Sequence, residues 1–189
     1  MKLRAALLAL LLVGACGTEA AAEGPASDAA IAAIAKPEVQ FENLVLRTLF
    51  STEGMAQAAY ALGIAQTCKL VRPAFDAAIA KGLPDWQVNL ISAYRDNVPQ
   101  DVLARAVTEA PAVTAATIAP FGDKIGAQMQ RDSERLLTDA LAATIAPAFE
   151  ASTKIDPKKI DGVARRAELK QAIADGTITC GLGRKAEAK

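Results

Sequence analysis

The stretch STEGMAQAAYALGIAQTCKLV, residues 51–71, decides the fold. Apolar residues recur in it at helical spacing, and they do so on two sides. A helix with two apolar sides is largely buried, because each side needs a partner to pack against. We therefore expect one helix here, capped by Ser51 and Thr52, at the centre of an all-α bundle. The two sides consist of Met55, Ala59 and Leu62, and of Tyr60, Ile64, Cys68 and Val71.

Further helices are expected before and after this stretch, because prolines and glycines divide the chain into amphipathic pieces. Pro37 is well suited to the first position of a helix, and Ser27 to the cap of the one before it. No strand of ordinary length is indicated. We expect helices over about residues 27–36, 37–50, 72–82, 84–97, 99–110, 112–130, 132–151 and 157–175, with extended chain at 177–180.

The composition fits a single, alanine-rich helical domain. The 189 residues are 52% hydrophobic but only 4% aromatic. Alanine favours helices and lets them approach closely, but each alanine buries little area. The expected fold is a single compact, Ala-rich multi-helix bundle with a thin core.

The first fifteen residues have the form of an export signal. Two cations precede an apolar run over residues 5–15, which is shorter than the roughly 20 residues that a membrane-spanning helix needs. The run ends in VGAC, residues 13–16, which resembles the lipobox of bacterial lipoproteins. The resemblance implies cleavage before Cys16 and a diacylglycerol on its sulfur. The alternative is an ordinary signal peptide, cut near Ala15 or Ala20, with Cys16 incidental.

The resemblance also implies a location. In proteobacterial lipoproteins, an aspartate directly after the lipidated cysteine often retains the protein in the inner membrane. Gly17 stands at this place. For a Gram-negative source, the resemblance therefore implies the periplasmic face of the outer membrane.

The cysteine count is consistent with such an anchor. Once Cys16 carries lipid, Cys68 and Cys180 remain, and two cysteines in an oxidising compartment are expected to pair. Their bond would close a loop of about 112 residues, which the chain-entropy model values at about 4.7 kcal/mol. If Cys16 is not lipidated, the alternative is that Cys68 and Cys180 are reduced.

The absence of histidine excludes several chemistries. The sequence has no histidine, so a Ser-His-Asp or Cys-His catalytic set and His-ligated zinc or haem are ruled out. It also has no phosphate-binding glycine motif. Without residues 1–15 the chain has 19 basic and 21 acidic residues, which argues against nucleic acid as a partner. No cofactor and no metal are expected.

Two groups of residues are candidate sites away from the cysteines. Trp86 and Tyr94 share one helical face and are either part of the core, which is favoured, or a surface for a ligand or partner. Asp132, Glu134 and Asp139 do not share a helical face, so a catalytic carboxylate pair is disfavoured.

The C-terminal part of the chain is basic. Residues 154–189 hold nine basic and five acidic residues. This charge would suit anionic lipid headgroups or an acidic partner, although a solvated helix face is favoured. The basic residues of the last expected helix and the segment before it are Lys154, Lys158, Lys159, Arg165, Arg166 and Lys170.

The expected organisation is a signal peptide at residues 1–15, a lipidated tether at 16–26, a helical domain at 27–180 and a mobile tail at 181–189. The expected function is that of a lipid-anchored, non-catalytic binding or assembly protein of the bacterial envelope. Its expected partners are the membrane, through the lipid, and an envelope protein. The first alternative is a carrier of a small apolar ligand, which predicts a closed apolar pocket near Trp86, Tyr60 or Phe75, whereas a protein partner predicts an exposed apolar groove. The second is a carboxylate-based cell-wall hydrolase, which predicts a cleft with two carboxyl groups.

Overall fold

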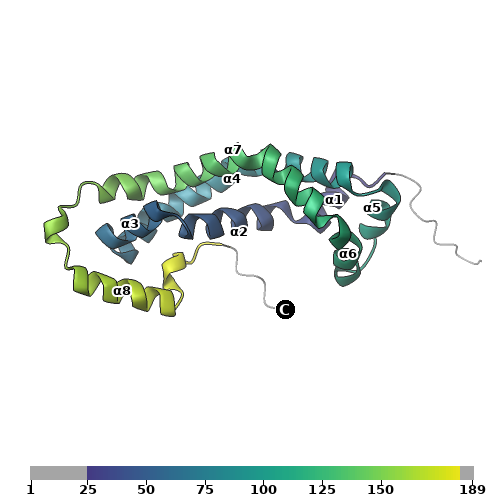
Figure 1. The fold of residues 1–189 in the computed structure, drawn as a ribbon. Coiled ribbons are helices and arrows are strands. Elements are labelled where there is room, and N and C mark those ends of the chain that lie inside the picture. Colours follow the sequence, from purple (N-terminus) through teal and green to yellow (C-terminus); the bar gives the residue numbers. More distant parts are fainter. Residues whose placement is uncertain (1–24, 184–189) are drawn as a thin grey trace, which may run out of the picture.

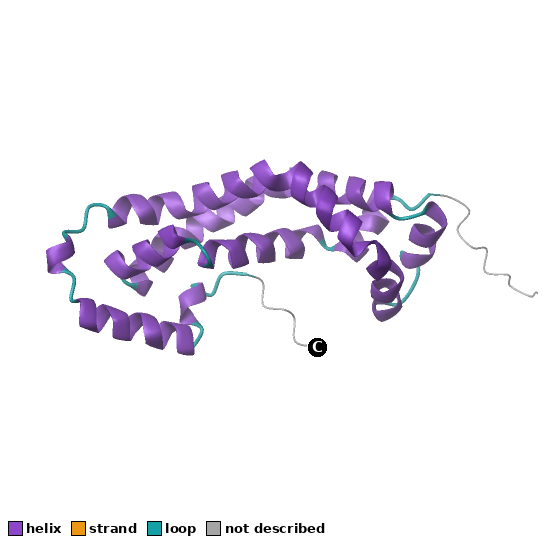
Figure 2. Cartoon of the chain, viewed as in Figure 1, coloured by secondary structure: helices purple, strands orange, loops and turns teal. Residues whose placement is uncertain are grey.

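The computed structural model describes residues 25–183, and within this range every regular element is a helix (Figures 1 and 2). The expected all-α bundle is thereby confirmed. Three short 3-10 turns, η1, η2 and η3, cover Ala119–Phe121, Pro157–Lys159 and Thr177–Thr179. The α-helices are α1 Asp28–Ala35, α2 Pro37–Phe50, α3 Glu53–Leu62, α4 Ile64–Asn97, α5 Gln100–Ala106, α6 Pro111–Ile118, α7 Gly122–Ser152 and α8 Gly162–Ala174.

The two longest helices, α4 and α7, lie side by side and run in opposite directions (Figure 1). The 34 residues of α4 span about 50 Å at 1.5 Å per residue. Helices α1 and α2 pack along α4, while α3 packs against α7 near one end. Helices α5 and α6 contact each other near the opposite end (Figure 1). The larger core cluster joins α1, α2, α4 and α7, and includes Phe41, Phe75, Trp86 and Leu90.

The expected single helix over residues 51–71 is wrong, because the chain breaks at Gly63 between α3 and α4. Gly63 has a φ of 86°, a conformation that glycine adopts without the clash of a side chain. Its N–H still donates to the carbonyl of Ala59 and closes α3. Thr52 caps α3 as expected, since its hydroxyl accepts from the N–H of Met55. Ser51 instead donates to the carbonyl of Thr48.

The expected helix boundaries at Pro37, Pro99 and Pro111 are confirmed, but those at Pro73 and Pro84 are wrong. Helix α4 continues through Pro73 and Pro84, so the separate helices at 72–82 and 84–97 do not exist. Both prolines are exposed, so the carbonyls that they leave unpaired lie on the solvent side of the helix. Helix α7 likewise continues through Pro147. It also continues through residue 131, where a boundary between two helices was expected. The expected helix at 112–130 is divided into α6, η1 and the start of α7.

The C-terminal region folds back along the bundle and is joined to it by the disulfide Cys68–Cys180, with 5.1 Å between the Cα atoms (Figure 1). The expected disulfide is thereby confirmed. The last helix begins at Gly162 rather than near 157, because the carboxylate of Asp161 caps it. Residues 177–179 form a 3-10 turn rather than extended chain.

The described part of the chain covers the expected helical domain and a little on either side of it. Ala26 is buried, and Leu182 packs against both core clusters. Cys16 and residues 184–189 lie outside the described residues. Within residues 25–183, no helix is both long enough and apolar enough to cross a bilayer.

Candidate functional site

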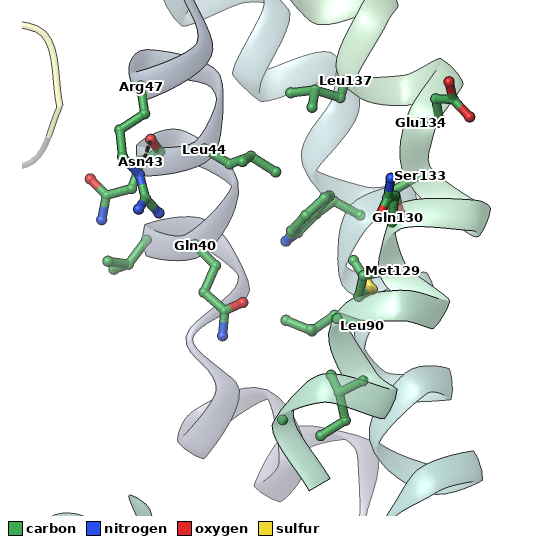
Figure 3. A pocket seen from close by; sticks show the side chains of 15 residues that line it. Gln40, Asn43, Leu44, Arg47, Leu90, Met129, Gln130, Ser133, Glu134 and Leu137 are labelled. Carbon is green, nitrogen blue, oxygen red and sulfur yellow. Dashed lines mark hydrogen bonds between the residues drawn. The ribbon is translucent and has the colours of Figure 1, made fainter. Parts of the chain in front are cut away.

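A groove of about 770 Å³ lies between α2 and α7, and α4 forms its floor (Figure 3). This volume falls in the range of about 300–1,000 Å³ that is typical of small-molecule sites. The groove differs from the expected closed pocket, because it is open to solvent and neither Tyr60 nor Phe75 lines it. Helix α2 contributes Val39, Gln40, Asn43, Leu44 and Arg47 to its lining, and α4 contributes Trp86 and Leu90. Helix α7 contributes Gly122, Ile125, Gly126, Met129, Gln130, Ser133, Glu134 and Leu137.

The floor of the groove is set by an aromatic pair. Trp86 is 4% exposed and stacks on Phe41 of α2 with 5.1 Å between the ring centroids. Gly82, one turn before Trp86, leaves room for this stack, since a Cβ there would lie 2.9 Å from the Cζ atom of Phe41. A glycine on α4 thus lets the aromatic side chain of α2 reach the tryptophan.

The indole N–H of Trp86 has no hydrogen-bond partner among residues 25–183, although its nitrogen is buried. Most buried polar atoms in proteins are paired, and leaving one unpaired costs about 1–3 kcal/mol. Trp86 lines the groove, so its indole N–H is a candidate donor to an acceptor on a bound molecule. The floor of the groove is thus mainly apolar and contains one buried donor that has no partner among the described residues.

The α7 wall of the groove is open at two glycines. A Cβ atom added at Gly122 or Gly126 would meet no atom within 4 Å. Any larger side chain at these places would project into free space and narrow the groove. The two glycines are spaced four residues apart, which places them on the same face of α7.

Apolar side chains face each other across the groove, and the polar lining residues other than the buried Ser133 are exposed. Figure 3 shows Leu44 pointing from α2 towards the other two helices, and Leu90 and Leu137 pointing towards α2. On α2, the amide of Gln40 donates to the carbonyl of Ala35 at 2.6 Å. The guanidinium of Arg47 donates from Nε to the carbonyl of Asn43 at 3.4 Å.

Carboxyl groups do not gather in the groove. Glu134 is the single carboxylate among the described residues that line it, and Figure 3 shows this side chain directed away from the space between the helices. Asp139 forms an exposed ion pair with Arg135 at 3.8 Å. Asp132 is exposed on α7 and is absent from the lining. The groove therefore lacks the two facing carboxylates that a glycosidase-type hydrolase requires.

The structure places Trp86 and Tyr94 in the core, with 4% and 9% of their surface exposed. Burial also raises the pKa of the Tyr94 hydroxyl. Trp86 is part of the core and also lines the groove. Tyr94, one of the two aromatic candidates, does not line the groove.

The basic candidates lie away from the groove. Lys158 and Lys159 form part of the exposed turn η2, and Arg166 is exposed on α8. Arg165 instead faces the bundle, where its Nη1 donates to Glu168 at 2.7 Å. These four residues thus do not form one surface.

No protein-family model, curated protein or solved structure matches this chain. The groove is therefore the feature from which we infer a function. The sequence did not reveal it, because its walls come from segments up to about 98 residues apart, from residue 39 to residue 137. The pair Gly122 and Gly126 was the available signal, since two glycines within a helix are disfavoured unless space is needed.

Proposed function

We propose that this protein is a non-catalytic, lipid-anchored binding protein of the bacterial envelope that carries a small apolar ligand in the groove between α2 and α7. The observation that carries the proposal is the groove itself, which combines an apolar lining with the unpaired indole N–H of Trp86. Ligand sites in proteins share this combination of a mainly apolar lining and a few convergent polar groups.

The chemistry of the lining indicates the kind of ligand. Leu44, Leu90 and Met129 offer an apolar surface to the body of a ligand, and each buried Å² of such surface contributes about 25 cal/mol. An acceptor atom on the ligand would pair with the indole N–H of Trp86. Polar side chains at the edge, such as Gln40 and Asn43, suit a polar head group near solvent. The proposed ligand is therefore an apolar molecule with one polar, hydrogen-bond-accepting end.

The proposed location has two supports. The sequence VGAC at residues 13–16 resembles a lipobox, which implies a lipid on Cys16. The Cys68–Cys180 disulfide suits an oxidising compartment outside the cytosol. An anchored domain would hold its groove close to a membrane, where apolar molecules are concentrated.

The single tryptophan of the chain lines the groove and provides a direct test. The probe is cis-parinaric acid, a fluorescent polyene fatty acid that accepts energy from tryptophan. We expect saturable energy transfer from Trp86 to this probe with the Cys16→Ser protein. Gly126→Leu fills the groove and should weaken binding by at least about tenfold, since one leucine displaces several ligand carbons. Transfer that does not saturate would contradict the proposal.

The matched control is Ala127→Leu. This residue is the exposed neighbour of Gly126 on α7 and does not line the groove. The Ala127→Leu variant should bind the probe like the parent protein. Equal loss of binding in both variants would mean that the leucine acts on α7 and not on the groove, and would overturn the assignment of the site.

A further inference from the structure

The charges of α8 are divided between two sides of the helix. Val163, Arg166, Lys170 and Ile173 fall within about 80° of one another at 100° per residue, and all four are exposed. Glu168 and the flanking Asp161 and Asp175 fall on the opposite side. The outer side of α8 thus carries cations and exposed apolar residues, while the acidic residues lie away from it.

Hydrogen bonds hold the acidic residues in place. Glu168 accepts from the N–H of Ile64 at 2.9 Å and from Arg165 at 2.7 Å, which fixes α8 against the start of α4. Asp161 accepts from two N–H groups at the start of α8. In contrast, none of the ion pairs found within residues 25–183 involves Arg166 or Lys170. The outward cations are therefore available to an external anion.

The apolar residues on the same side are among the most exposed in the described structure. Val163 is 73% exposed and Ile173 is 64% exposed, and they lie near the two ends of α8. Lysine and arginine at a membrane surface are attracted to anionic headgroups, and exposed aliphatic side chains beside them bury apolar area when they enter the interfacial region. Lys158 and Lys159 in η2 add positive charge directly before this helix.

We propose that the outer side of α8, defined as Val163, Arg166, Lys170 and Ile173, binds the surface of an anionic phospholipid membrane. The cations pair with headgroup phosphates, and the two aliphatic side chains enter the interfacial region. A protein partner fits this surface less well, because lysine is depleted in protein interfaces and aromatic anchors are absent from these four positions. Anionic bilayers attract lysine and arginine alike as point charges.

The proposed membrane contact at α8 lies far from the N-terminal end of the described chain. The carbonyl of Ala26 accepts from Arg95 near the end of α4, whereas α8 docks at Ile64, the first residue of α4. These points are about 45 Å apart along the helix. A lipid on Cys16 and a membrane contact at α8 would therefore hold the protein at both ends, so that the bundle lies along the membrane.

The test is sedimentation of the full chain with vesicles. The Cys16→Ser protein is used, so that no lipid of its own contributes to binding. It is mixed with vesicles of phosphatidylcholine alone or of phosphatidylcholine and phosphatidylglycerol in equal parts. We expect binding only to the anionic vesicles, with release when the salt concentration is raised and screens the charges.

The double variant Arg166→Glu/Lys170→Glu should bind the anionic vesicles at least about tenfold more weakly. The control Lys124→Glu/Arg131→Glu changes the net charge by the same amount at exposed positions on α7, and it should bind like the parent. Far-UV circular dichroism checks that both variants stay folded. No binding to anionic vesicles, equal loss in both variants, or binding to polyglutamate but not to vesicles would overturn the proposal. Probe binding in the groove is measured separately, so either proposal can fail alone.

Discussion

The indole ring of Trp86 stacks on the phenyl ring of Phe41, with 5.1 Å between the centroids and 25° between the planes. Phe41 is fully buried, so this stack joins α2 to α4 at the floor of the groove. It depends on Gly82, where a Cβ would lie 2.9 Å from one atom of the Phe41 ring and 3.0 Å from another. The aromatic pair and the small residue beneath it therefore fix the distance between the two helices.

The same substitution at two helical glycines should have opposite effects on stability. Gly82→Ala should lower the free energy of unfolding by about 1 kcal/mol, since the clash with Phe41 outweighs the better helix propensity of alanine. A Cβ added at Gly126 meets no atom within 4 Å. Gly126→Ala should therefore raise the free energy of unfolding by up to about 1 kcal/mol. Urea unfolding of both variants measures the difference. Two changes of the same sign would show that the Phe41 ring moves aside freely.

The helical class and the disulfide could be predicted from the sequence, because both depend on simple patterns. Apolar periodicity identified the helices, and the cysteine count paired Cys68 with Cys180. The positions of the helix ends could not be predicted in the same way. Pro73 and Pro84 favour helix ends locally, but their exposed positions leave the packed side of α4 intact against α7.

The groove could not be predicted either, because three segments distant in the sequence build it. Trp86 was correctly assigned to the core, yet nothing in its local sequence shows that α2 and α7 leave a space beside it. Gly63 is a similar case, since glycine is tolerated inside a helix and only its φ of 86° shows that it ends one. Tertiary packing decides both features.

Loss of the disulfide should release the C-terminal region. Helix α8 has one buried residue, Ala172, so little apolar packing holds it without the bond. Cys68→Ser/Cys180→Ser should lower the free energy of unfolding by up to about 4.7 kcal/mol. Trypsin should then cleave near Lys154, Lys158 and Lys159 much faster. The control is the Cys16→Ser protein, which keeps the disulfide. Equal cleavage rates in the control and in the double variant would contradict this account of α8.

Glu168 should stabilise the junction of α3, α4 and α8. Its carboxylate accepts from the N–H of Ile64 and so caps a helix that lacks a side-chain cap of its own at Gly63. Glu168→Ala should lower the free energy of unfolding by about 1 kcal/mol. Glu150→Ala, an exposed glutamate on α7, is the control and should have little effect. Equal effects in urea unfolding would argue against the cap.

Tyr94 should make stability depend on alkaline pH. Burial raises its pKa, so the folded state holds the phenolic proton more tightly than the unfolded state does. The contribution of Tyr94 to the free energy of unfolding is fully present below the ordinary tyrosine pKa of about 10, and it is lost as pH rises through the raised pKa. Tyr94→Phe should therefore lose less stability than the parent between pH 8 and pH 11. Urea unfolding measures the free energy of unfolding of both proteins across this pH range. Equal losses in the two would contradict the burial of this hydroxyl.

The central claim is that the groove between α2 and α7 holds an apolar ligand, and native mass spectrometry tests it most directly. The Cys16→Ser protein and its Gly126→Leu variant are purified from their native source under identical mild conditions. We predict that the first carries the added mass of one small apolar molecule and that the variant does not. A bare chain in both samples, or the same added mass in both, would contradict the claim.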